Sequence, residues 1–321
     1  MIETTFIAYL PILLLVVGML MLLPAPLLAA HRMLAGSAVL AIALGSALLA
    51  VMGVGTLFLL PCLAFLIAAP LLERSRFLGL AAAALAGSAA IHYAIPLLSP
   101  YLPASDTVMM MQVALIVALL IGMVGGMKLP LHPQRHRNDG HAVWHAAPQG
   151  LILAGWVLVT AAIAGTVGIA TMGRAQVIAA LVAALAALAH AQLGHGRDSW
   201  QKAGEGLLAG VVITLLVPLA PLAAAAAGLL AGFLVTRSEA IALSLRLDDP
   251  HHFLGALLLP AMFGLLLPGI AELALLAGQL KWLGAAIALA AVISLILWPL
   301  SMFLLGIALP PRLVREGVQP R

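Results

Sequence analysis

Long, continuous runs of apolar residues alternate with short polar segments along most of the chain. A run of about 20 apolar residues is what an α-helix needs to cross roughly 30 Å of hydrocarbon. The runs do not alternate between apolar and polar residues, and they are rich in alanine and leucine, which disfavours a transmembrane β-barrel. Because helices satisfy every backbone group within lipid, the pattern predicts an all-α polytopic membrane protein.

The apolar runs define eleven predicted membrane-spanning helices. The first residues, Met1-Ile2-Glu3, lack the basic region of a signal peptide, so we expect the first run to be a retained span. The predicted helices lie near 5–30, 34–52, 54–72, 77–98, 107–127, 147–170, 174–193, 203–220, 222–244, 251–270 and 280–309.

The positions of the basic residues predict how these helices are oriented. Eleven spans place the two termini on opposite sides of the membrane. With the N-terminus outside, thirteen of the fifteen lysines and arginines fall on the inner side, and the exceptions are Arg174 and Lys281. Positive charge concentrates in cytoplasmic loops, so we predict an outer N-terminus and a cytoplasmic C-terminus in the cell (inner) membrane.

Composition excludes several classes of function. Hydrophobic residues make up 64% of the chain and charged residues 8%. The net charge of +4 comes from basic residues spread over loops, which disfavours a nucleic-acid partner. The single cysteine, Cys62, lies within an apolar run and forms no intrachain disulfide. No hydrolase triad or phosphate-binding loop is present, so we expect neither enzymatic activity nor a cofactor.

Two acidic residues stand at equivalent places in the predicted layout. Asp106 opens the fifth helix and Asp249 opens the tenth, and Ala114 and Leu257 follow them at the same spacing. Helix capping explains each acid taken alone, because a carboxylate accepts unpaired backbone N–H groups. The same device five helices apart also suggests an inverted repeat.

The repeat divides one domain, which spans residues 1–321. Its parts are the halves at about 5–127 and 147–270, a final helix at about 280–309, and a short cytoplasmic tail at 310–321.

Several short motifs occur in a characteristic order from about residue 54 onward. They are Glu73-Arg74-Ser75-Arg76-Phe77, Gly155-Trp156, the glycine-rich stretch from Gly204 to Pro218, Gly228 to Gly232, Arg246-Leu247-Asp248-Asp249-Pro250, Phe253 to Gly255, and Arg315-Glu316-Gly317. In order and spacing they resemble the ammonium transporter/Rhesus (Amt/Rh) family. The resemblance implies eleven helices, an inverted five-plus-five repeat, and a homotrimer with one pore in each subunit.

The chain departs from that family at the positions that line its pore. The resemblance implies a pair of pore histidines on the fifth and tenth helices, and Ala114 and Leu257 stand there instead. Neither residue can relay a proton. At the outer gate and pore wall, the residues in the corresponding positions are Leu59, Val159 and Thr160. The scaffold is therefore predicted to remain while the polar pore chemistry is lost.

This loss favours a neutral solute. A charge at bilayer depth costs roughly 2.5–3.5 kcal/mol even on lenient scales, and an apolar wall offers no compensating dipoles. We predict a channel for a small neutral solute, ammonia or another gas. One alternative is a non-conducting trimeric scaffold or sensor with a cytoplasmic protein partner. The other is an ordinary ammonium transporter that uses a different polar site.

Three further groups of residues are candidate sites. His132, His136, His141 and His145 have partial zinc-ligand spacing, but Pro130 and Pro133 disfavour a helix there, so a solvated basic loop is preferred to a metal site. Met109, Met110 and Met111 would suit copper(I) but point three ways on a helix. Glu205 is either a functional intramembrane acid or the partner of Lys202, and the sequence leaves both open.

Overall fold

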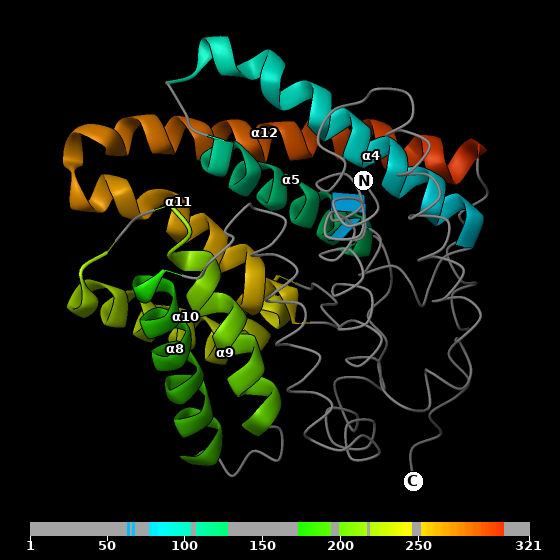
Figure 1. Cartoon of the computed structure of the whole chain (residues 1–321). Helices are drawn as coiled ribbons and strands as arrows, with labels where there is room; N and C mark the ends of the chain where they lie inside the picture. Colours follow the sequence, from blue (N-terminus) through cyan, green and yellow to red (C-terminus); the bar gives the residue numbers. More distant parts are fainter. Residues whose placement is uncertain are drawn as a thin grey trace, which may run out of the picture.

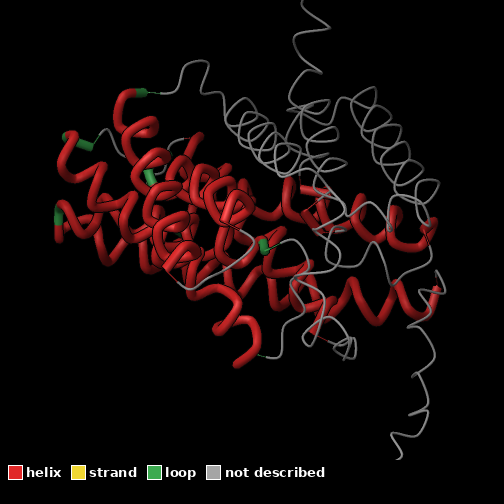
Figure 2. The backbone as a smooth tube through the Cα atoms, turned by 90° about the horizontal axis from the view of Figure 1, so that it is seen from below, coloured by secondary structure: helices red, strands yellow, loops and turns green. Residues whose placement is uncertain are grey.

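The computed structural model describes residues 63–64, 66–67, 77–103, 107–127, 173–193, 199–216, 219–245 and 252–304. These residues are almost entirely helical, and no strand occurs among them (Figure 2). Five stretches within them are long and apolar enough to cross a membrane: Ala82–Tyr101, Arg174–Leu193, Pro221–Ala242, Leu254–Ala271 and Leu273–Ser301. The protein is a multi-pass helical membrane protein.

Four of the predicted helices agree closely with the observed ones. They are α4 (Phe77–Leu98), α5 (Thr107–Met127), α8 (Arg174–Leu193) and α10 (Pro221–Ser244). A short 3₁₀ turn, η2 (Ser99–Tyr101), extends the end of α4. The total of eleven helices, their orientation and the inverted repeat also depend on residues outside the described ranges, and they stay predictions.

Helix α9 (Ser199–Ile213) begins and ends earlier than the predicted span at 203–220. Its last turn tightens, since the backbone N–H groups of Thr214 and Leu215 donate to carbonyls three residues back. The Thr214 hydroxyl also donates to the Gly210 carbonyl, at 2.9 Å. These bonds satisfy carbonyls that a longer helix would have used, so the helix stops before Pro218.

The predicted span at 251–270 consists of two pieces, the π-helix η4 (Leu254–Leu258) and α11 (Leu259–Ala271). The last helix, α12 (Leu273–Leu304), begins earlier than the expected residue 280. Glu272 alone separates α11 from α12, with an extended backbone at φ −135° and ψ 99°. The connection between these two helices is therefore much shorter than the sequence suggested.

The helices form two groups that α11 connects (Figure 1). In one group the long helix α12 packs against α5 and α4; in the other, α8, α9 and α10 pack against one another. Helix α11 contacts α12 and α5 on one side and α9 on the other. This arrangement places α5 beside the η4–α11 segment, where the sequence located the pore positions.

Two buried tryptophans attach α12 to the rest of its group. Trp282 Nε1 donates to the Pro103 carbonyl and Trp298 Nε1 to the Ile121 carbonyl on α5, both at 3.1 Å. Both indole rings are almost fully buried. Each therefore combines a large apolar contact with a hydrogen bond that holds its orientation.

Replacing Trp298 by phenylalanine is expected to lower the free energy of unfolding by about 1–2 kcal/mol, because a hydrogen bond and ring volume are both lost. Denaturant titration in mixed micelles measures the change. Phe303→Leu is the control, since Phe303 lies on the same helix and is largely exposed. Equal effects of the two substitutions would contradict the anchoring role of Trp298.

Four glycines of α9 and α10 allow α8, α9 and α10 to pack backbone to backbone. A Cβ on Gly206 would lie 2.7 Å from the Ala183 carbonyl oxygen, and one on Gly228 would lie 2.5 Å from that of Ala179. Gly210 and Gly232 meet the same two alanines of α8. Close packing of these three helices therefore depends on the absence of a side chain at these four glycines.

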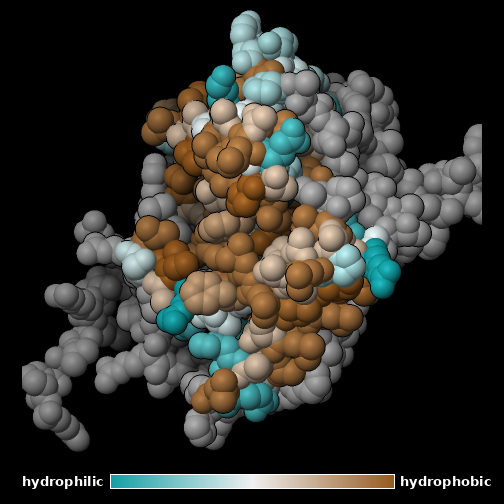
Figure 3. All heavy atoms as spheres, turned by 90° about the vertical axis from the view of Figure 1, so that its left-hand side faces the viewer, coloured by the Kyte–Doolittle hydropathy of each residue, from teal (hydrophilic) through white to brown (hydrophobic). Residues whose placement is uncertain are grey.

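Large apolar side chains are exposed on the outside of several helices. Figure 3 shows that apolar residues dominate one face of the described surface. Examples are Leu181 on α8, Leu229 on α10, and Ile296 and Phe303 on α12, each more than half exposed. Contiguous apolar patches of this kind are rare on soluble monomers and are expected where a protein meets lipid or another membrane subunit.

Candidate functional site

Ala114 and Leu257 occupy one apolar interior. Ala114 lies on α5 and Leu257 in η4, each about 1% exposed. Both belong to the same cluster of buried apolar side chains, and α5 contacts both η4 and α11. The fold thus brings together the two segments that carry the predicted pore positions, while the lining role of these two residues stays a prediction.

The π-helix at Leu257 has a local cause in the sequence. The Leu259 N–H donates to the Leu254 carbonyl, which is the wider spacing of a π-helix. Pro260 follows and has no N–H, so the regular α-helical bond pattern is interrupted next to this turn. Such π-bulges are frequent at functional sites, and here the bulge includes Leu257 itself.

The amide of Gln112 lies in the same interior. Its Nε2 donates to the Ala261 carbonyl of α11 at 2.8 Å, and the residue is fully buried. Among the described residues, no group donates to Gln112 Oε1. The sequence pattern alone predicts no role for this glutamine. Its signal was present, however, as an uncharged polar residue inside an apolar span, which usually needs a partner.

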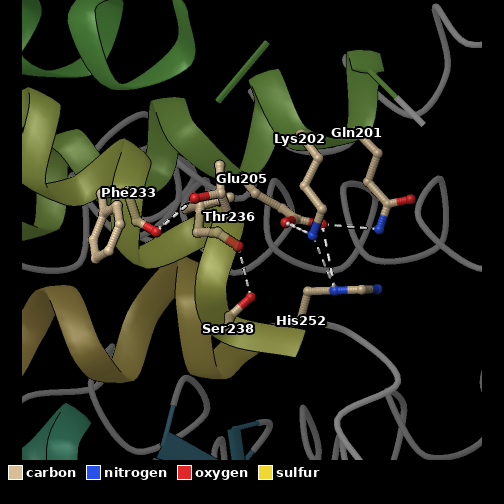
Figure 4. Close-up of polar contacts among 8 residues, drawn as sticks. Gln201, Lys202, Glu205, Phe233, Thr236, Ser238 and His252 are labelled. Atoms are coloured by element: carbon tan, nitrogen blue, oxygen red, sulfur yellow. Dashed lines mark hydrogen bonds and ion pairs between the residues drawn. The ribbon is translucent and has the colours of Figure 1, made fainter. Parts of the chain in front are cut away.

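A second polar group joins α9 to the start of η4 (Figure 4). Glu205 is fully buried and accepts hydrogen bonds from Gln201 Nε2 and Lys202 Nζ, both at 2.9 Å. His252 Nδ1 lies 3.5 Å from Lys202 Nζ and 3.8 Å from Glu205 Oε1. The pairing of Glu205 with Lys202, one of the two alternatives from the sequence, is therefore confirmed.

The backbone of His252 is unusual and fits this position. Its φ of 54° lies in the left-handed region, where histidine is enriched among non-glycine residues. The Ala256 N–H donates to its carbonyl at 3.1 Å, so the first turn of the next helix starts here. The polar group around Glu205 thus fixes the point at which the chain enters η4.

The remaining predicted positions lie outside the described residues. These are the gate and wall positions Leu59, Val159 and Thr160, the helix-start acids Asp106 and Asp249, and the histidines of the loop at 128–146. Within the described ranges, no three histidine, cysteine, aspartate or glutamate side chains gather as metal ligands would. Met109 and Met110 pack against the apolar cluster.

Comparisons with known proteins bear on the fold. No protein family matches the sequence, and no curated protein matches it. Among solved structures, the chain is similar to one described as "Sensor Amt Protein", with a TM-score of 0.63 and 17% sequence identity over 77% of this chain and 70% of that chain. At this identity the likeness shows the fold alone. The chain has an Amt-like membrane fold, in agreement with the resemblance in its motifs.

Proposed function

We propose that this protein is a divergent member of the Amt/Rh family that forms a channel for a small neutral solute, ammonia or another gas. The observation that carries the proposal is the shared apolar burial of Ala114 and Leu257 between α5 and η4, within an Amt-like fold. Neither alanine nor leucine can relay a proton, so these positions favour a solute that crosses in its neutral form.

Ammonium is disfavoured for an electrostatic reason. The cluster around Ala114 and Leu257 is apolar, and the Gln112 amide is one of the uncharged polar groups that lie close to it. A single amide dipole replaces little of the hydration shell that an ion must shed. A neutral molecule avoids most of that cost.

The proposal includes an assembly and a location that follow from the family resemblance. We propose a homotrimer in the cell (inner) membrane, with an outer N-terminus, an inverted repeat of five plus five helices, and one path in each subunit. The protein acts without enzymatic chemistry and without a bound cofactor.

Reconstituted vesicles test the channel. A stopped-flow ammonia pulse is expected to change the internal pH faster in protein-containing vesicles than in empty liposomes, and ammonium is expected to evoke no current on a solid-supported membrane. Equal rates in the two vesicle preparations would remove the channel proposal. An ammonium-evoked current would instead favour the ordinary transporter, which needs a different polar site.

A sensor or scaffold is the second candidate, favoured by one observation. The similar solved structure is described as a sensor Amt protein. In this alternative the trimer binds a cytoplasmic protein and conducts nothing. This alternative predicts that ammonia permeates protein-containing vesicles no faster than empty liposomes. It also predicts that affinity capture from native membranes recovers a partner protein in stoichiometric amount. Repeated capture without such a partner would argue against it.

A further inference from the structure

The side-chain amide of Gln112 has a fixed orientation. Its Nε2 points to the Ala261 carbonyl oxygen at 2.8 Å, and a turned-over amide would place two acceptor oxygens against each other. Oε1 is therefore the atom that faces away from Ala261 as an acceptor. It is buried, and among the described residues no donor reaches it.

A buried acceptor without a donor carries a desolvation cost. The structural bond of Gln112 to α11 uses its amide nitrogen alone, so the oxygen adds nothing to that bond. A second buried glutamine shows the usual arrangement, since Gln279 Oε1 accepts the Gly269 N–H at 2.6 Å. The contrast between these two amides indicates that Gln112 Oε1 is available to accept a hydrogen bond from a bound molecule.

Gln112 lies close to the predicted solute path. Its partner Ala261 stands one helical turn beyond Leu257 in the adjoining helix. Space at the amide depends on Gly264, where a Cβ would lie 2.8 Å from Gln112 Nε2 and 2.7 Å from the Ile213 carbonyl oxygen. The amide is thus held where α5, α11 and the end of α9 converge.

We propose that Gln112 Oε1 is a binding point for a small uncharged N–H donor, such as ammonia, between α5 and α11. This inference rests on the proposed channel and specifies its solute class. The amide is uncharged, and so are Ala261 and Gly264, which its nitrogen meets, so its single acceptor oxygen suits a neutral hydrogen-bond donor. A gas without a donor group, such as carbon dioxide, gains no hydrogen bond there, so the site selects donors.

Nuclear magnetic resonance of the protein in bilayers, with glutamine side chains labelled, tests this binding directly. Ammonia at alkaline pH is expected to shift the Gln112 side-chain carbonyl resonance, and trimethylamine, which has no N–H, is expected to leave it in place. Gln279 is the internal control, because its oxygen is already bonded. Loss of one resonance in Gln112→Met assigns the signal, and Gln112→Leu serves if that variant does not fold.

An unchanged Gln112 resonance at saturating ammonia overturns the site whether or not the channel conducts. Flux through Gln112→Met vesicles gives the second readout. Ammonia permeability is expected to fall about fivefold, the factor for one net hydrogen bond, while carbon dioxide permeability stays the same. If wild-type and variant vesicles conduct equally and no resonance shifts, the site fails and the channel stands. If ammonia permeates wild-type vesicles no faster than empty liposomes, the channel proposal fails. The Gln112 resonance then still shows whether ammonia binds at this site.

Discussion

Replacing Lys202 by methionine is expected to lower the free energy of unfolding by about 3 kcal/mol, because it leaves the Glu205 carboxylate buried without its cation. The Lys202 side chain is 17% exposed and that of Glu205 is 0% exposed, with 2.9 Å between Nζ and Oε2. This loss of unfolding free energy lies at the low end of the range for breaking a buried ion pair, because Lys202 retains some contact with solvent. Denaturant titration in mixed micelles measures the loss.

A second variant separates charge from packing in this pair. Glu205→Gln combined with Lys202→Met removes both charges and keeps an oxygen for Gln201 Nε2. We expect the double variant to recover most of the lost stability. Lys281→Met is the matched control, since Lys281 is exposed on α12, and its effect should stay within about 0.5 kcal/mol. A double variant as unstable as Lys202→Met would show that the carboxylate charge is not the cause.

Gly210→Val is expected to lower the free energy of unfolding by about 3 kcal/mol, at the upper end of overpacking effects, and to reduce the yield of folded protein. Even a Cβ there would lie 2.6 Å from the Ala180 Cα and would press on the Ala179 carbonyl oxygen. These are backbone atoms of α8, so no side chain can rotate away. The helices α8 and α9 would have to separate.

Gly284→Val on α12 is the matched control for that substitution. A Cβ on Gly284 meets nothing within 4 Å. Valine is also no worse than glycine in a helix interior, so stability should change by less than about 0.5 kcal/mol. The two variants are compared by thermal unfolding in detergent and by the monodisperse fraction after purification. Similar losses at the two glycines would contradict the backbone contact at Gly210.

The ends of several helices were predictable because strong local signals mark them. Helices α4, α5 and α8 follow predominantly apolar runs, and their predicted bounds agree with the structure. The errors occurred where apolar residues continue past a helix end. The hydropathy of residues 214–220 predicts that they belong to the membrane span, yet hydrogen bonds at Thr214 end α9 earlier. Hydropathy measures the preference for lipid and does not report which carbonyl a hydroxyl will satisfy.

The candidate site was partly predictable. The family resemblance, aligned on the helix-start acids Asp106 and Asp249, pointed to Ala114 and Leu257, and the structure places both in one buried apolar cluster. The pairing of Glu205 with Lys202 was also foreseen, because residues three apart share a helix face. Gln112 was missed as part of the site, since its partner Ala261 is 149 positions away in the sequence.

The sequence by itself determined that this chain is a helical membrane protein, because lipid demands long apolar helices whatever their arrangement. Tertiary structure decided which residues meet. The glycines of α9 and α10 had to find the same two alanines of α8, and the amide of Gln112 had to find a carbonyl on α11. Such contacts depend on the rotation and tilt of each helix. Packing between helices sets both of these, whereas hydropathy does not define them.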